Sequence, residues 1–426
     1  MNTHEKSCVG WAPAWSVMSV VTTAVGRVRG WAIAADDLID TAHGHPTGDP
    51  DPLGIEPGAI ERLVERARQE VDAGHLPSCQ VALARHGRIV ATRTFGAPPS
   101  SRYVVYSTTK AITAGAVWRL LDAGAVTRDT RVAEVIDGFD ANGKHGVTVE
   151  HLLTHTAGFP HAVITHDEWN DPVARHERFA AWEPEWEPGS RFTYHGTSAH
   201  WVLAAVAESA TGRDFREYVA TEVLDPLGLA DLRLGVPETR QGDVLDVVTV
   251  GDAPDPARFA DIGATTGLDV SAIGVSDEGL LEHNDPAVRA LGQPAGGAIG
   301  RAADLALYYQ ALLANPGGLW RAGTLAAGTS EVLCTHADPM TGVASNRSLG
   351  LLIAGDDGNA FMRGFGTATS ARAFGHMGAG GQVAWADPAT GLSFAYLTNG
   401  LDRDPIRMGI RSNDLSTLAA SVAVLG

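Results

Sequence analysis

The 426-residue sequence predicts an α+β fold, in which an antiparallel β-sheet is flanked by helices and a mainly helical domain is inserted into the chain. Strand-like runs occur near both ends of the chain, helical runs fill its middle, and no fixed-period repeat suggests a solenoid. With 44% hydrophobic and 19% charged residues, the chain has the composition of a globular protein that buries a sizeable core. We therefore expect one large unit rather than several small domains.

Residues 1–55 are expected to form an N-terminal extension or linker, because residues 43–54 are rich in Gly, Pro and Asp. The packed domain is expected over residues 56–426. Its α/β part should comprise about 56–105 and 340–426, and its helical insert about 106–339.

The elements follow in order from the spacing of apolar residues. A helix is predicted over 56–74, and two short apolar runs around His86-Gly87 predict a β-hairpin. Two polar stretches, 161–189 and 234–291, are predicted to be long loops of the kind that form lids or binding walls. The remaining predicted elements are helices at 108–123, 198–211, 302–313 and 404–422, and strands at 80–84, 88–92, 349–354, 373–377, 382–386 and 393–398.

Charge and cysteine content exclude several classes of partner. The formal net charge is −18, so nucleic acid and anionic membranes would be repelled, and we expect neither as a partner. The three cysteines lack C-x-x-C spacing, which gives neither a disulfide framework nor a zinc site. We expect a cytoplasmic protein. Export remains open, because residues 7–26 form an interrupted apolar run that is weak both as a signal peptide and as a membrane helix.

The strongest local motif is Ser107-Thr108-Thr109-Lys110, at the start of a predicted helix. Ser107 would lie near the positive end of the helix dipole, and Lys110, one turn later, would share its face. A serine hydroxyl needs a base to become a nucleophile, and a lysine amine serves once burial lowers its pKa. Only three of the 32 basic residues are lysines, so the position of each is informative. The alternative is that Ser107 caps the helix and Lys110 is solvated.

Together with this motif, four further segments resemble one family in the same order: residues 151–158 (HLLTHTAG), 187–194 (EPGSRFTY), 295–300 (AGGAIG) and 374–381 (FGHMGAGG). From about residue 57 to its end, the chain resembles the serine β-lactamase-like hydrolases: class C β-lactamases, DD-peptidases and family VIII carboxylesterases. The resemblance implies an antiparallel-sheet domain and a helical domain, with the active site between them.

The family's Tyr-x-Asn motif falls on Tyr194-His195-Gly196. The resemblance implies that Tyr194 is the partner base and acid of the Ser107–Lys110 pair. Gly196 replaces the asparagine that holds the catalytic lysine in relatives, so His195, Thr197 or a water molecule is expected to compensate. His195 is accordingly expected to contact the substrate.

The third motif, Lys-Thr-Gly in penicillin-active relatives, reads His376-Met377-Gly378. A mostly neutral imidazole suits a substrate carboxylate less well than an ammonium does, so this change favours uncharged esters. We expect His376 and Gly378 to contact substrate, with a structural role for His376 as the alternative. The resemblance also implies an oxyanion hole formed by the backbone N–H groups of Ser107 and Ala379.

These residues predict a serine hydrolase that cleaves carboxylic esters, and by extension lactones, through an acyl-enzyme on Ser107, with no cofactor and no metal. The alternatives are a β-lactamase or D-amino-acid peptidase, an acyltransferase, and a non-catalytic binding protein of the same fold. Trp169, Trp182 and Trp186 on the first long loop suggest an aromatic or bulky small-molecule substrate, or else simply pack. His151 and His155 are read as structural. The sequence leaves the natural substrate and the formation of homo-oligomers open.

Overall fold

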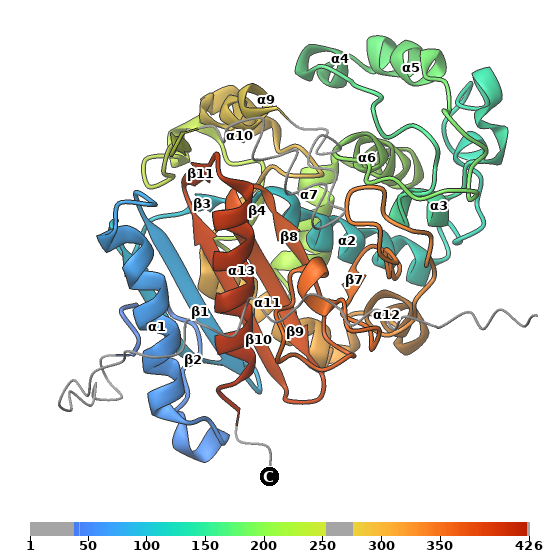
Figure 1. The fold of residues 1–426 in the computed structure, drawn as a ribbon. Helices are drawn as coiled ribbons and strands as arrows, with labels where there is room; N and C mark the ends of the chain where they lie inside the picture. Colours follow the sequence, from blue (N-terminus) through green and yellow to red (C-terminus); the bar gives the residue numbers. More distant parts are fainter. Residues whose placement is uncertain (1–37, 42, 253–275, 424–426) are drawn as a thin grey trace, which may run out of the picture. The chain divides into compact units, whose positions relative to one another are not determined.

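The computed structural model describes residues 38–41, 43–252 and 276–423. A six-stranded sheet in the order β2-β1-β10-β9-β8-β7 forms its centre, and every neighbouring pair is antiparallel (Figure 1). The N-terminal hairpin is joined to the C-terminal strands because β1 pairs with β10 along its whole length. The predicted α+β class is confirmed. The strands are β1 (Cys79–Arg85), β2 (Arg88–Phe95), β7 (Leu352–Ile353), β8 (Phe374–Gly378), β9 (Gln382–Asp387) and β10 (Leu392–Thr398).

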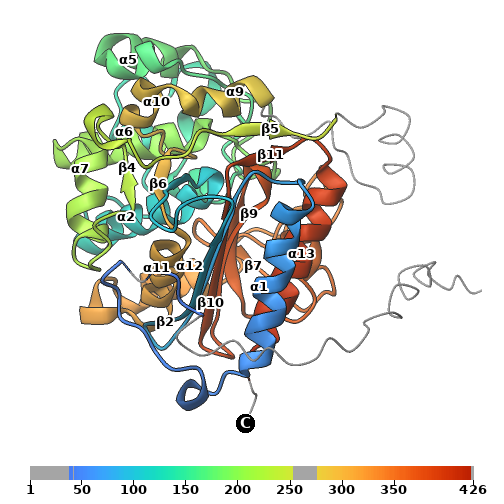
Figure 2. The same ribbon diagram turned by 90° about the vertical axis from the view of Figure 1, so that its left-hand side faces the viewer.

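Helices cover both faces of this sheet. α1 (Pro57–Asp72) and α13 (Pro405–Ala420) pack on one face, and α11 (Ala302–Ala314) packs on the other (Figure 2). α11 is apolar almost all round, as expected for a helix buried between the sheet and the helical region. All seven residues of β10 are buried, because helices cover both of its faces.

The β1–β2 hairpin closes through the two residues that the sequence analysis placed in the turn. His86 and Gly87 have φ angles of 51° and 74°. Positive φ at both central residues defines a type I′ turn, whose twist matches that of the flanking strands.

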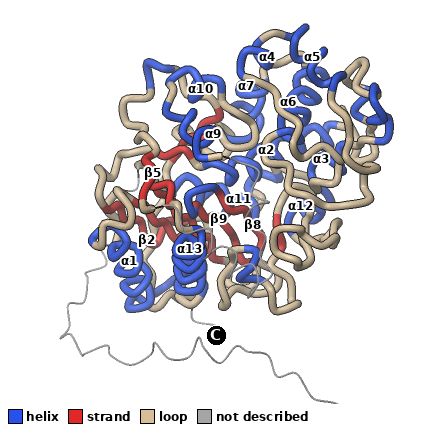
Figure 3. The backbone as a smooth tube through the Cα atoms, turned by 45° about the horizontal axis from the view of Figure 1, so that its top comes forward, coloured by secondary structure: helices blue, strands red, loops and turns tan. Residues whose placement is uncertain are grey.

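The helical region lies in the chain between the hairpin and the C-terminal strands. Figure 3 shows most of its helices to one side of the strands. α2 is its connection to the sheet, because it packs against α6, α12 and β8. One apolar cluster runs from the sheet through α2 and α6, so the two parts share a core. The helices are α2 (Thr109–Ala123), α3 (Val149–Leu153), α4 (His166–Asn170), α5 (Pro172–Ala181), α6 (Ser198–Thr211), α7 (Phe215–Val219), α9 (Asp277–Leu281), α10 (Pro286–Leu291) and α12 (Ala322–Thr329).

Two small sheets border this region. β3 (Tyr103–Val104) and β4 (Arg233–Leu234) both pair with β6 (Ala298–Gly300). β5 (Val248–Val250) runs parallel to β11 (Gly400–Asp402). In the first of these sheets, β3 ends three residues before Ser107, so its pairing with β6 helps to fix the entry of the chain into α2.

Several predicted boundaries needed correction. The strand expected over 349–354 shortens to β7, because Gly350 has a φ of 106° and breaks the extended run. The polar stretch 161–189 is not one loop, since it contains α4 and α5. Leu38 and Ile55 are buried, and Ile39 and Thr47 form bridges to β2, so the described part of the expected linker lies along the sheet. The predicted division at about residues 106 and 339 remains a prediction.

The apolar run at 7–26 and part of the second polar stretch lie outside the described residues. Within the described ranges, no helix combines the length and the apolar character needed to cross a membrane.

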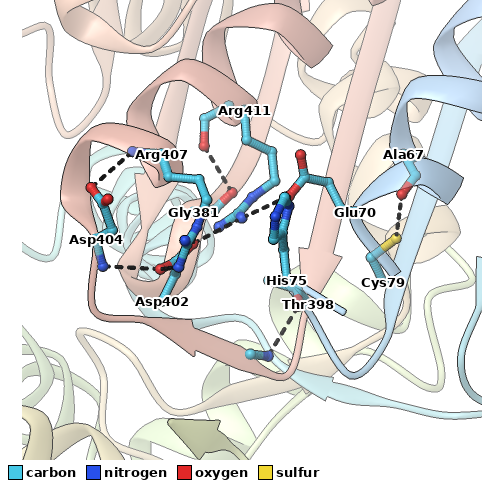
Figure 4. A network of polar contacts seen from close by, with 12 residues as sticks. Ala67, Glu70, His75, Cys79, Gly381, Thr398, Asp402, Asp404, Arg407 and Arg411 are labelled. Carbon is cyan, nitrogen blue, oxygen red and sulfur yellow. Dashed lines mark hydrogen bonds and ion pairs between the residues drawn. The ribbon is translucent and has the colours of Figure 1, made fainter. Parts of the chain in front are cut away.

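A buried ionic network joins α13, α1 and β11. The Arg411 guanidinium is fully buried and contacts Glu70 of α1 and Asp402 of β11, each at 3.1 Å (Figure 4). Asp402 also accepts from Arg407 at 2.6 Å, and the Ser412 hydroxyl donates to the Gly381 carbonyl at 3.2 Å. These contacts connect both terminal helices to the turn that follows β8.

Replacing Arg411 with methionine should destabilise the protein by about 3–5 kcal/mol, because Glu70 and Asp402 would lose a buried partner. Urea unfolding of the purified variant measures this. Arg62→Met is the matched control, since its pair with Glu56 is exposed and should contribute less than about 1 kcal/mol. Equal unfolding midpoints for the two variants would contradict the role given to Arg411.

Candidate active site

Ser107 lies in a short 3-10 helix, Tyr106–Thr108, that leads directly into α2. Its neighbours are buried, whereas Ser107 itself is partly exposed. The cap residue of α2 is Thr108, and no side chain caps the helix, so the interpretation of Ser107 as an N-cap is wrong. The Ser107 hydroxyl is therefore not used for capping, and it lies at a partly exposed position within a buried segment.

The residue before Ser107 has a strained backbone. Tyr106 has a φ of 45°, a conformation that costs a non-glycine residue about 1–3 kcal/mol. Its hydroxyl donates to the Leu280 carbonyl at 3.1 Å, and its ring meets His283 edge-on at 5.4 Å. These contacts hold the strained turn that presents Ser107.

Lys110 is fully buried, and its Nζ lies 3.1 Å from the Ser107 Oγ. The amine also donates to the carbonyl oxygens of Gly196 at 2.8 Å and Ala295 at 3.0 Å. Burial, with a smaller contribution from the charge of Arg347, lowers the pKa of Lys110 well below its ordinary value. A neutral amine has two N–H groups and one lone pair. With the two carbonyls accepting the N–H groups, the lone pair is left for the Ser107 hydroxyl.

The Gly196 carbonyl accepts a hydrogen bond from Lys110, at the position where relatives have the asparagine of the Tyr-x-Asn motif. His195, Thr197 or a water molecule was expected to hold the lysine, but the main chain at Gly196 makes this contact. An asparagine side chain is therefore not needed to bind Nζ.

The ring of Tyr194 faces the lysine, with its centre 5.0 Å from Nζ. Burial raises the pKa of Tyr194, while a hydrogen bond with Ser107 and the charge of Arg347 lower it. The His155 ring stacks against it at 4.9 Å, in agreement with a structural role for that histidine. Ser107, Lys110 and Tyr194 therefore form one contiguous group.

His195 does not face this group. It is fully buried, its Nδ1 donates to the Thr193 carbonyl at 2.7 Å, and its Nε2 accepts from the Phe159 N–H at 3.2 Å. Because the backbone satisfies both ring nitrogens, the structure gives no support to the expected substrate contact.

His376 is likewise occupied. Its Nδ1 donates to the Met377 carbonyl at 2.6 Å, and its Nε2 accepts from Nη1 of Arg347 at 3.1 Å. Burial and the charge of Arg347 lower the pKa of His376, so the ring is neutral. The structure shows a contact of His376 with Arg347, and the expected contact with substrate remains a prediction.

The end of β8 approaches the segment that carries the nucleophile. A Cβ on Gly378 would lie 2.8 Å from the Val105 carbonyl oxygen, so only glycine fits without displacement. Ala379 follows and packs on an apolar cluster that includes Tyr106. Gln382 fixes this approach, since its Nε2 donates to the Val104 carbonyl at 2.9 Å. The oxyanion-hole role of the Ser107 and Ala379 N–H groups remains a prediction.

Sequence reasoning missed three contributors: Arg347, the Ala295 carbonyl and Gln382. Arg347 and Gln382 have no local signal, because each acts through a neighbour that is distant in sequence. Ala295 lies in one of the segments that carry the family resemblance, so the sequence offered a signal for this contact.

The tryptophans divide into two kinds. Trp182 is buried, and Trp169 stacks on Trp201 at 4.4 Å with Arg175 against its ring, so both pack within the helical region. Trp186 is partly exposed and lies 6.3 Å from His195. Over the residues that the structure describes, no group of three or more His, Cys, Asp or Glu side chains is arranged to hold a metal ion.

Comparison with known proteins identifies the family. The Beta-lactamase family profile matches residues 61–418, so the chain belongs to the beta-lactamase family. It is 29% identical over 313 residues to the esterase/beta-lactamase LipL of Mycobacterium tuberculosis. The matched region covers 70% of this chain and 69% of LipL.

Solved structures show the same likeness. A family VIII carboxylesterase has 25% identity and a TM-score of 0.69, covering 88% of this chain and 99% of its own. A penicillin-binding protein homologue from Caulobacter crescentus has 26% identity and a TM-score of 0.67, covering 86% and 99%. The predicted family is confirmed, and the protein is a serine hydrolase of the β-lactamase fold.

Replacing Gly378 with alanine should cost about 1–3 kcal/mol, because the added Cβ would overlap the Val105 carbonyl. The displacement of β8 should also slow modification of Ser107 by a fluorophosphonate at least tenfold. Thermal unfolding and intact-mass spectrometry measure the two effects. Gly146→Ala, where an added Cβ meets nothing within 4 Å, is the control and should change neither value. A Gly378→Ala variant that unfolds and reacts like the wild type would refute the close approach.

Proposed function

We propose that this member of the beta-lactamase family hydrolyses carboxylic esters, lactones included, through an acyl-enzyme on Ser107. The observation that carries the proposal is the environment of Lys110, a buried amine that faces two carbonyls and the Ser107 hydroxyl at 3.1 Å. An amine in this setting is a base for that hydroxyl.

In the proposed reaction, Ser107 Oγ bonds to the ester carbonyl carbon while its proton passes to Lys110. The carbonyl oxygen takes up the displaced electron pair, and the N–H groups of Ser107 and Ala379 stabilise it. Each such donor contributes about 3 kcal/mol in related acyl transfer. The tetrahedral intermediate expels the alkoxide, which Tyr194 protonates, and Lys110 returns a proton to Tyr194. Water then attacks the acyl-enzyme with the same pair as base, releasing the acid and restoring Ser107.

The third motif supports an ester without a carboxylate as the preferred substrate. His376 is neutral and has no free ring nitrogen. Met377 has no hydroxyl, and its side chain packs against Gly364 rather than toward the position of His376. The similarity to a family VIII carboxylesterase supports the same assignment.

A β-lactam is the second candidate substrate, on two observations. The relative LipL is described as an esterase/beta-lactamase. Arg347 places a guanidinium directly behind His376, where it would attract a substrate carboxylate. For location, we propose the cytoplasm, with support from Cys79 and Cys334, which are buried free thiols rather than a disulfide.

Ser107→Ala should abolish turnover of p-nitrophenyl butyrate, because it removes the hydroxyl that contacts the Lys110 amine and would form the acyl-enzyme. Lys110→Met, which keeps the length but removes the amine, should lower kcat about 10²- to 10⁴-fold. Initial rates on purified protein, with thermal unfolding as the check on folding, measure both effects.

Nitrocefin assayed in parallel separates the two substrate classes. Ester turnover well above nitrocefin turnover is expected, and the reverse order would favour the β-lactamase assignment. A wild-type protein that neither turns over esters nor forms a Ser107 adduct with a fluorophosphonate would be a binding protein. Diversion of the acyl group to added alcohol would instead indicate an acyltransferase.

A further inference from the structure

Arg347 differs from the other buried arginines. Six arginine side chains are buried among the described residues, and five of them pair with a carboxylate. Arg347 has no carboxylate within ion-pair distance in the described part of the chain, and its Nε has no hydrogen-bond partner there. An unpaired buried charge is costly, so its retention calls for an explanation. The five paired arginines are Arg102, Arg289, Arg301, Arg363 and Arg411.

The guanidinium of Arg347 contacts Tyr194 of the catalytic group, together with His376 and Phe192 beside it. Nη1 donates to His376 at 3.1 Å, and the guanidinium carbon lies 5.5 Å from the ring centres of both Tyr194 and Phe192. Stacking a cation on desolvated aromatic rings recovers about 2 kcal/mol, which only partly offsets the loss of hydration. The neutral form of His376 is what allows its Nε2 to accept this hydrogen bond.

The backbone fixes Arg347 in this place. Its N–H donates to the Cys334 carbonyl at 3.0 Å, and its own carbonyl accepts from Leu333 at 2.8 Å. It also bridges to Leu352 of β7, the strand beside β8. The guanidinium therefore comes from a neighbouring segment and contacts His376, the residue that stands where penicillin-active relatives have a lysine.

We propose that Arg347, held by His376, is a positioning residue that supplies the fixed positive charge beside Lys110 and Tyr194 which the His-Met-Gly motif lacks. The proposal rests on the Ser107 mechanism above. A fixed cation disfavours a second cation on Lys110 and stabilises the phenolate that Tyr194 becomes when it gives up its proton.

Both effects have the same sign. Loss of Arg347 would raise the pKa of Lys110 and that of Tyr194, so the free base would form only at higher pH. In the described part of the chain, the other titratable groups that face the pair are histidines whose pKa burial lowers, so they stay neutral over the same range. They are His155, which follows α3, His200 of α6 and His376 of β8. Burial lowers the pKa of the Arg347 guanidinium itself, and the charges of Asp338 and Cys334, which face it, raise that pKa.

The test is the pH dependence of kcat/KM for an uncharged p-nitrophenyl ester. Arg347→Met should move the acidic limb upward by about one pH unit, the size expected from removing one nearby charge. Arg347→Lys should keep the limb near its wild-type position. Arg363→Met is the matched control, since this arginine is equally buried but paired with Asp357. It should lower the unfolding temperature without moving the limb.

Returning the charge by another route makes the test sharper. The double variant Arg347→Met with His376→Lys places an ammonium in the third motif itself, and should move the limb back toward the wild-type pH. An unshifted limb in folded Arg347→Met would overturn the proposal. If KM then rose only for esters or β-lactams that carry a carboxylate, Arg347 would be a substrate anchor. If only stability fell, its role would be structural.

A readout independent of turnover separates this inference from the proposed function. In modification by a fluorophosphonate, the Ser107 Oγ–P bond forms, fluoride leaves, and the hydroxyl proton passes to the same base. The pH dependence of this rate, followed by intact mass, should show the same shift in Arg347→Met. If the modification rate shifts in Arg347→Met but the wild type does not turn over esters, the role of Arg347 is supported and the esterase function is rejected. If the wild type turns over esters but the modification rate does not shift, the esterase function is supported and the role of Arg347 is rejected.

Discussion

The site depends on one constraint, which is that the amine of Lys110 is buried with no carboxylate in contact with it among the described residues. Transfer of a charged ammonium into such a place costs far more than transfer of a neutral amine, so burial itself selects the basic form. Had a carboxylate been one of its partners, it would have favoured the ammonium instead. The two carbonyls that hold Nζ bind the amine without restoring that charge. The chemistry available to Ser107 follows from this arrangement.

The fold is what makes the burial possible. The carbonyls of Gly196 and Ala295 come from segments 86 and 185 residues away from Lys110, and they meet because α2 lies between the helical region and the sheet. On the opposite side, the strained Tyr106 turn and the glycine at 378 let β8 approach the nucleophile. The Ser412 hydroxyl connects the turn after β8 to α13, and Arg411 connects α13 to α1. The elements at the two ends of the described chain thus support a site built from its middle.

Most of the architecture could be predicted from the sequence because it depends on local patterns. The periodicity of residues 198–211 gave the bounds of α6, and His86-Gly87 marked the hairpin turn. The strand expected over 349–354 is shorter than predicted, because Gly350 adopts a positive φ that interrupts the extended run. The nucleophile and base lie one turn apart, so a motif also reveals them. Arg347 could not be found in this way, since its role depends on contacts with residues far along the chain, among them His376, 29 positions later.

The substrate contacts expected of His195 and His376 stay predictions, and the structure gives them no support for a common physical reason. A neutral imidazole has one donor and one acceptor, and in both residues a backbone group or a guanidinium uses each of them. Motif matching treats the side chain at a position as the group that acts there. In this protein the third motif lacks a cation in sequence but has one in space, because the histidine accepts a hydrogen bond that a lysine could not accept. The histidine at 376 and the arginine at 347 therefore belong to a single electrostatic arrangement, because the hydrogen bond between them holds the guanidinium in place.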